Sequence, residues 1–250
     1  MARRLNSSLG EIGDYMKLFQ PKKKKGATLM STQVSEIVYS FVCHAATEAA
    51  KGIIEDMDVG NKDAEKKKLE FDLSIAFIVV ASFDVEMHAA EDKNLHTAIM
   101  DGVCDLYFDD LRKFSQDHIK NSVDAGFFIR DKDEIALFVD QFPPHAKAKV
   151  DINNFRCKTT LHTIADLLFN KRFLEYQELW KSDMIKAVNK QPGFIPQMPH
   201  KVYEHWSGKS GEESRTFESL MFTTQLFTCF SSFSLALSNQ LSEITMRENR

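Results

Sequence analysis

The sequence predicts an all-α protein, a bundle of about seven helices with an N-terminal amphipathic arm. Glycine and proline are few, 10 and 6 among 250 residues, so the turn residues that a many-stranded sheet needs are missing. Apolar residues recur at spacings of three and four along most of the chain, which is the period of an amphipathic helix. Near the C-terminus, 24 residues from Ser219 to Ser242 carry no charge, although charged residues make up 27% of the chain.

Residues 1–26 are predicted to form a helical arm and a linker. Apolar residues alternate at spacings of four and three through residues 2–19, and Pro21 ends this pattern. The lysines at 22–25 are typical of a solvated linker, and the run also has the composition of a nuclear import signal. We expect the arm to dock on the body or on a partner through one stripe: Leu5, Leu9, Ile12, Met16 and Phe19.

Residues 27–250 are predicted to form a single helical domain. Residues 75–81 have the composition of a strand, but the long periodic pattern around them, without Gly or Pro, favours a buried helix. Residues 191–215 contain three prolines and are expected to form an irregular loop that covers a bundle end or binds a ligand. The expected helices cover about 31–57, 63–90, 94–123, 131–142, 155–189 and 219–242.

Composition narrows the class of protein. The net charge is -4 and no aromatic residues interleave the lysines of the linker, which argues against a nucleic-acid partner. The absence of an apolar signal segment at residues 1–20 and the isolated cysteines are typical of a reducing cytoplasm. These cysteines are expected to be small buried residues: Cys43, Cys104, Cys157 and Cys229.

The uncharged stretch has three interpretations: a membrane span, the central helix of the bundle, or half of a dimer interface. Gln225, Asn239 and Gln240 lower its hydrophobicity, and no Trp or Tyr marks its ends, so a membrane span is the least favoured. Its hydroxyl groups are expected to bond either to carbonyls of the preceding turn or to a ligand.

Acidic residues and histidines provide candidate metal ligands. If the helices at 31–57 and 63–90 form a hairpin, Asp84 faces Glu36, and His88 lies one turn along from Asp84. This trio is a candidate site for a divalent metal ion; the alternative is that Asp84 bonds to His88 within one helix while Glu36 stays in water. A row of aspartates on the next helix points away from its apolar face and is expected to be solvated: Asp101, Asp105 and Asp109.

No signature of an enzyme family occurs in the sequence. Both GxSxG and ExxH are missing, so neither a nucleophile elbow nor the usual di-iron site is predicted. The leading hypothesis is a non-catalytic protein that acts by contact with a protein partner or with itself, as an adaptor, regulator or assembly subunit. The alternative is an enzyme or sensor with a ligand or metal site inside the bundle. No cofactor is predicted apart from the divalent metal. The candidate partner-binding residues are those of the arm stripe together with Phe194 and Trp206.

Overall fold

The computed structural model describes residues 27–57, 59–89, 92–118, 140, 148, 158–191 and 193–247. Side chains are described for these residues except at 27, 112–118 and 158–165. The predicted arm, its lysine linker and the helix expected at 131–142 lie outside the described residues.

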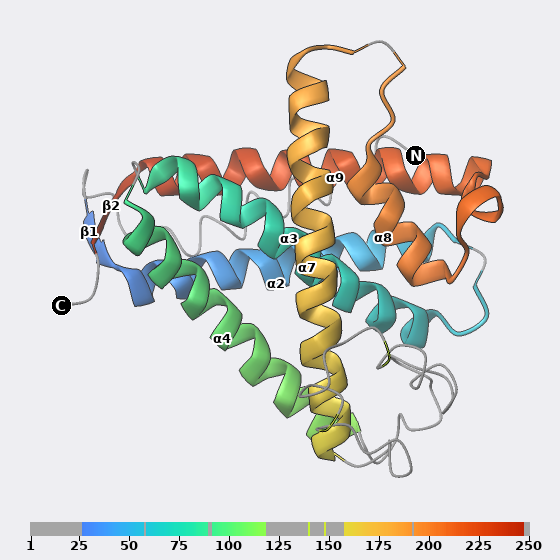
Figure 1. Ribbon diagram of the computed structural model, residues 1–250, viewed down its shortest axis with the longest axis horizontal. Coiled ribbons are helices and arrows are strands. Elements are labelled where there is room, and N and C mark those ends of the chain that lie inside the picture. Colours follow the sequence, from blue (N-terminus) through green and yellow to red (C-terminus); the bar gives the residue numbers. More distant parts are fainter. Residues whose placement is uncertain are drawn as a thin grey trace. The chain divides into compact units, whose positions relative to one another are not determined.

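The described residues are mostly helical, which confirms the all-α class, but they form six α-helices rather than about seven. One of the six, α8, lies within the segment that we expected to be irregular, so that expectation is wrong for residues 197–207. The elements (Figure 1) are β1 (Ala27–Met30), α2 (Ser31–Glu55), α3 (Lys62–His88), α4 (Lys93–His118), α7 (Lys158–Val188), α8 (Gln197–Ser207), the short 3₁₀ helix η2 (Gly211–Ser214), α9 (Phe217–Ser242) and β2 (Ile244–Arg247).

The described residues divide into two compact units, one formed by those of 27–104 and 175–247 and the other by those of 105–174. Helices α4 and α7 each contribute to both units. Within the second unit, four aromatic side chains of these helices pack together. The ring centroid of Phe169 lies 5.1 Å from that of Tyr107 and 4.8 Å from that of Phe108, and the Phe173 ring is stacked on Phe169 at 5.7 Å. Such edge-on and tilted pairs add to the stability that ring burial provides.

The first unit is built around α3. This helix pairs with α2 in a hairpin, and it packs against α8 and α9 on its other sides (Figure 1). Residues 75–82 of α3 are all buried, so the prediction of a buried helix at 75–81 is confirmed. The Phe77 ring lies 4.9 Å from both Phe230 and Phe233 of α9. A helix that is apolar on nearly all sides needs neighbours on all sides.

Helix α9 packs on α3 through one face only. Its buried apolar side chains all lie on that face, while Leu220 is 45% exposed. The central position therefore belongs to α3, and α9 covers it. The buried apolar residues of α9 are Phe222, Leu226, Phe230, Phe233, Leu237 and Leu241.

Two short strands join the two ends of the described chain. β1 and β2 pair in parallel, with Ala27 opposite Ile244 and Met30 opposite Arg247. Because β1 leads into α2 and β2 follows α9, this pair holds the start of α2 beside the end of α9. The sequence did not predict these strands.

A glycine lets α4 approach α2 closely. Ser35 Oγ of α2 lies 2.9 Å from the carbonyl oxygen of Ser31 and 2.8 Å from that of Ile99 on α4, so its single hydroxyl hydrogen is shared between the two acceptors. A Cβ atom at Gly102 would lie 2.5 Å from Ser35 Oγ and 2.9 Å from Ser35 Cβ, closer than real Cβ contacts. Glycine is therefore required at this crossing.

We predict that Gly102→Ala destabilises the protein by about 1–3 kcal/mol, because the added methyl group must push the two helices apart or displace Ser35. Gly52→Ala is the matched control, since a Cβ there meets no atom within 4 Å; it should raise the free energy of unfolding by up to about 1 kcal/mol through its better helix propensity. Urea unfolding of both variants measures the difference. Equal effects of the two substitutions would contradict the close approach at Gly102.

Candidate functional site

The predicted metal trio is not assembled in the structure. Glu36 is exposed on α2, Asp84 is buried on α3, and His88 is half-buried one turn further along α3. Among the residues that the structure describes, no group of three or more His, Cys, Asp or Glu side chains is placed to hold a metal ion. The hairpin register that suggested the trio does not bring the Glu36 side chain into the interior.

Asp84 and His88 instead bond to two serines of α9. The Ser234 hydroxyl donates to Asp84 Oδ1 at 2.8 Å, and His88 Nε2 lies 2.8 Å from Ser238 Oγ. The two serines, like the two α3 residues, lie one helical turn apart, so the polar pairs form successive rungs between the helices. The alternative expectation, a bond between Asp84 and His88, is replaced by these contacts across helices.

The second oxygen of Asp84 is buried without a hydrogen-bond partner, in a side chain that is only 1% exposed. Burial raises the pKa of Asp84 to about 7, against the opposing effect of the Ser234 hydrogen bond. A catalytic triad would need this carboxylate to orient the imidazole of His88. Here it bonds to a different serine, so the Ser238–His88 contact lacks the third member of a triad.

A second polar cluster joins α3, α7 and α8. The Tyr176 hydroxyl lies 3.3 Å from Asp72 Oδ1 and 2.8 Å from His205 Nδ1, and His205 Nε2 lies 3.3 Å from Glu175. Asp72 and Tyr176 are buried, whereas Glu175 and His205 are partly open to water. The chain of contacts thus leads from the core to the surface.

Lys201 connects this series of contacts to a second carboxylate, that of Glu204. Its Nζ lies 3.3 Å from Glu175 and 3.0 Å from Glu204, and Glu204 also accepts from the Ser214 hydroxyl at 2.9 Å. Burial acts to raise the pKa of both glutamates, but the hydrogen bonds and the positive charges around them outweigh it, so both pKa values are lowered. Both groups are therefore ionised at neutral pH, which suits ion pairing and not general-acid catalysis.

Asp183 of α7 caps the N-terminus of α8. Its carboxylate is fully buried and accepts from the backbone N–H of Gln197 (2.9 and 2.8 Å) and of Met198 (2.8 Å). Burial raises the pKa of Asp183, although the two backbone donors oppose that shift. The negative charge lies at the positive end of the α8 dipole. Sequence reasoning missed this cap because donor and acceptor are 14 residues apart, beyond any local capping pattern.

The two predicted partner-binding residues outside the arm both pack inward. Phe194 is half-buried, with its ring 6.0 Å from that of Phe227. Trp206 is 4% exposed and stacks on Phe222 at 5.7 Å, so its ring belongs to the core and forms no part of an exposed surface. The predicted arm residues Leu5, Leu9, Ile12, Met16 and Phe19 lie outside the described residues.

The aspartates of α4 follow the expectation of a solvated face, since Asp101, Asp105 and Asp109 are all exposed. Cys229 is half-buried on α9, and burial raises the pKa of its thiol to about 11. The thiol is therefore protonated at neutral pH, which argues against a nucleophilic role.

Of the helices in the described part of the chain, only α9 has the length and apolar composition to cross a membrane, with a mean hydropathy of 1.4 over 18 residues. This is weak support for a span, because core helices of soluble proteins pass the same test; about a third of that window, 33%, is buried within the protein. Comparison of the chain with protein-family models, with curated proteins and with solved structures finds no match.

We predict that Asp84→Asn stabilises the protein near pH 8 by a few kcal/mol and changes little near pH 4. The folded state holds Asp84 with a raised pKa, so it binds the proton more tightly than the unfolded state does. The contribution of Asp84 to stability is therefore fully present below about pH 4 and is lost as the pH rises towards 7. The amide resembles the protonated acid at every pH.

Urea unfolding of both proteins across pH 4–8 measures this difference. Asp101→Asn, at an exposed carboxylate of α4, is the control and should shift stability by less than about 0.5 kcal/mol throughout. A difference between Asp84→Asn and the parent that stays constant with pH would contradict the raised pKa.

We also predict that Asp183→Ala costs about 1–2 kcal/mol, because the first amides of α8 lose their acceptor. Asp183→Asn keeps one carbonyl oxygen and should cost less. Hydrogen exchange should show faster exchange at Gln197 and Met198 in the alanine variant, and Glu178→Ala, at an exposed site on the same helix, should leave both rates unchanged. Unchanged exchange in Asp183→Ala would rule out the cap.

Proposed function

We propose that this protein acts without catalysis, by contact, as an adaptor, regulator or assembly subunit, and that a second copy of the chain is one of its partners. The observation that carries the proposal is the outer face of α9, which is exposed along the whole helix and bears no charged side chain. This face comprises Phe217, Leu220, Met221, Thr224, Thr228, Ser231, Leu235, Asn239 and Ser242.

The apolar residues of this face are large and well exposed. Phe217 is 78% exposed and Leu235 is 66% exposed. A helix of 26 residues is about 39 Å long, so the uncharged strip extends over a distance comparable to a small domain. Large exposed apolar side chains on an uncharged face of a protein are typical of an interaction site.

The hydroxyl groups of the face are already bonded within the helix. Thr224 donates to the Leu220 carbonyl at 2.8 Å, Thr228 to that of Thr224 at 2.9 Å, and Ser231 to that of Phe227 at 2.9 Å. Because these hydroxyls have partners on the preceding turn, covering them removes few hydrogen bonds to water. Their intrahelical bonds make the middle of the face less polar than its composition suggests.

The arrangement of large and small residues suits pairing with itself. Thr228 lies seven residues from both Met221 and Leu235, so an antiparallel pair of α9 helices with its twofold axis at Thr228 sets Met221 of each copy against Leu235 of the other. The small Thr and Ser residues meet at the centre, where they permit close approach. An isologous contact repeats the same patch on both copies, and an uncharged patch does so without like-charge repulsion.

Sedimentation velocity of the full chain over a dilution series tests the pairing. We predict that Met221→Glu or Leu235→Lys alone weakens the dimer by at least about tenfold, because each places an unpaired charge against an apolar side chain. The double variant should regain much of the affinity, because the antiparallel arrangement sets each new carboxylate against a new ammonium group. A parallel pair would set like charges together and show no recovery.

Met87→Lys is the matched control, since Met87 is a 67% exposed apolar residue on α3 and is not one of the residues of the outer face of α9; it should leave the dimer constant unchanged. A parent protein that stays monomeric at all concentrations would refute self-association, and single variants that pair as the parent does would refute the α9 face.

A second candidate function is a ligand or proton sensor inside the bundle. It rests on the unpartnered oxygen of buried Asp84 and the adjacent Ser234, His88 and Ser238 contacts. A thermal shift with divalent metals or small polar ligands that disappears in Asp84→Asn would favour this candidate over the contact protein.

A further inference from the structure

The C-terminal end of α7 and the loop after it expose four large aliphatic side chains within twelve residues. Val188 is 74% exposed, Ile195 57%, Ile185 55% and Met184 39%. We call this region, residues 181–195, the α7 tip. In Figure 1 this end of α7 extends beyond α9.

The fold holds these side chains outside because the opposite face of α7 is fixed inside. Trp180 packs on Phe230 and Phe227 of α9, and Asp183 is bound to the first amides of α8. At about 100° per residue, Ile185 lies on the opposite side of the helix from Trp180 and Asp183, Val188 lies towards that side, and Met184 lies at the edge of the buried face. Rotating the helix to bury them would expose Trp180 and break the cap of α8.

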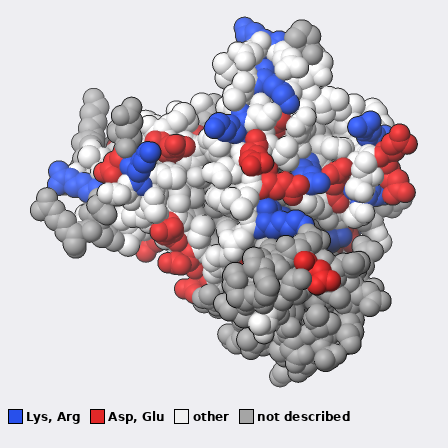
Figure 2. Space-filling model, in the orientation of Figure 1, with Lys and Arg blue, Asp and Glu red and all other residues white. Residues whose placement is uncertain are grey.

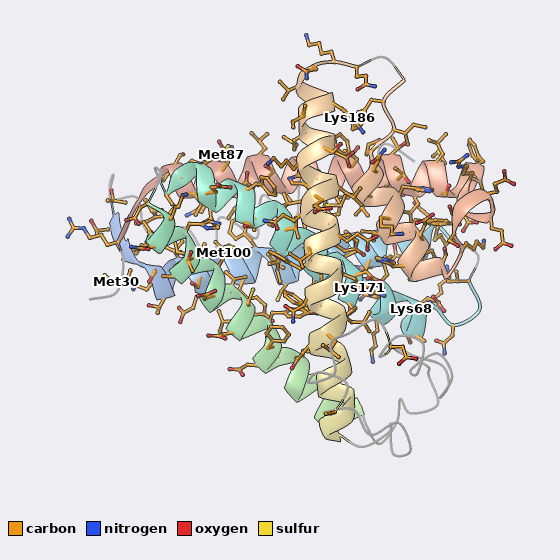
Figure 3. The ribbon with its side chains drawn as sticks, viewed as in Figure 1. Met30, Lys68, Met87, Met100, Lys171 and Lys186 are labelled. Carbon is orange, nitrogen blue, oxygen red and sulfur yellow. The ribbon has the colours of Figure 1, made fainter. Side chains whose placement is uncertain are left out.

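The exposed charge at the α7 tip is entirely positive. From Leu179 to Pro196 the sequence holds Lys181, Lys186 and Lys190 and a single acidic residue, Asp183. Asp183 is fully buried, whereas Lys181 and Lys190 are exposed and Lys186 is half-exposed. Figure 3 shows Lys186 at this end of α7, and in Figure 2 the outer end of the projection carries blue and white atoms.

We propose that the α7 tip docks on the surface of an anionic lipid bilayer, with its aliphatic side chains in the interfacial region and its lysines beside the headgroups. Exposed aliphatic residues beside lysines are the combination that such a surface attracts, because the bilayer takes up apolar groups of any shape while ammonium groups stay at the anionic interface. The contact is peripheral and reversible. It uses a different helix from the α9 pairing and does not depend on it.

A protein partner fits the α7 tip less well. The centres of protein interfaces are rich in Trp, Tyr and Arg and poor in Lys. Among the described residues of 181–195, Phe194 is the one aromatic residue and packs inward on Phe227; the segment contains no Trp, Tyr or Arg. Its charge has one sign, which matches the uniform charge of an anionic membrane surface.

Co-sedimentation of the full chain with vesicles tests the proposal. We predict that the protein binds vesicles of phosphatidylcholine with phosphatidylserine, binds phosphatidylcholine alone much more weakly, and dissociates when salt screens the charges. Lys181→Gln with Lys190→Gln should lower the partition coefficient roughly 30-fold, about fivefold for each lysine. Ile185→Ser with Val188→Ser should lower binding to both kinds of vesicle.

Because all four substituted residues are exposed, the variants should unfold at the parent temperature, and a thermal melt confirms that loss of binding is not loss of fold. The matched control is Met87→Ser with Lys209→Gln, an exposed apolar residue and an exposed lysine outside both the α7 tip and the outer face of α9, and it should bind as the parent does. The proposal is overturned if the parent does not bind phosphatidylserine vesicles at low salt, or if the tip variants bind unchanged. Loss of binding in the control variant alone would place the membrane contact elsewhere on the protein and would also overturn it.

Discussion

The burial of α3 is the constraint on which the first unit depends. From Phe71 to Val85 nearly every side chain of this helix is buried, on all sides. Because α3 is apolar on all sides, a single neighbouring helix cannot shield it from water. Helices α2, α8 and α9 must therefore each pack an apolar face against it. The amphipathic faces of those helices are consequences of this requirement, because each needs to be apolar only where it meets α3.

Two buried carboxyl groups interrupt the apolar surface of α3, and each has a partner on another helix. Asp72 meets the Tyr176 hydroxyl of α7, and Asp84 accepts from Ser234 of α9. A buried acid without a partner is costly, so these contacts favour one register of each covering helix over its neighbours one turn away. Asp183 acts in the same way on α8, whose first turn it binds. Apolar packing explains why the helices cover α3, and the acids explain where along it they lie.

The sequence predicted what depends on local pattern and missed what depends on distant partners. The buried helix at 75–81 followed from its periodicity and length. The sequence pattern does not predict helix α8 because Pro196 and Pro199 are typical of an irregular loop, although proline is tolerated in the first turn of a helix. The cap on the first turn of α8 comes from Asp183, 14 residues earlier in the sequence, so the local pattern was a poor guide.

The candidate sites show the same limit. Asp84 and His88 were correctly singled out as polar residues on an apolar helix, but the partners predicted for them were a metal ion shared with Glu36 at hairpin register, or each other. The actual partners are serines of α9, some 150 residues away in sequence. Serine is common on both buried and exposed helix faces, so its spacing along α9 carried no signal that it would meet Asp84.

The composition of segment 219–242 suggested a helix with neighbours on most sides. Composition alone cannot tell a helix face that packs on the rest of the same protein from a face that is left for a partner, whereas the structure distinguishes these two faces of α9. Phe222, Phe230 and Leu237 are covered by the chain itself, whereas Phe217 and Leu235 on the opposite side are open. The charges typical of an exposed helix face are missing from the outer face of α9, and they are present on the exposed tip of α7, where lysines flank the aliphatic residues. An uncharged face gains from burial against another uncharged face, while a basic apolar tip gains from a surface that offers negative charge and hydrocarbon together. The difference in charge between these two surfaces is therefore the physical reason for assigning them different partners.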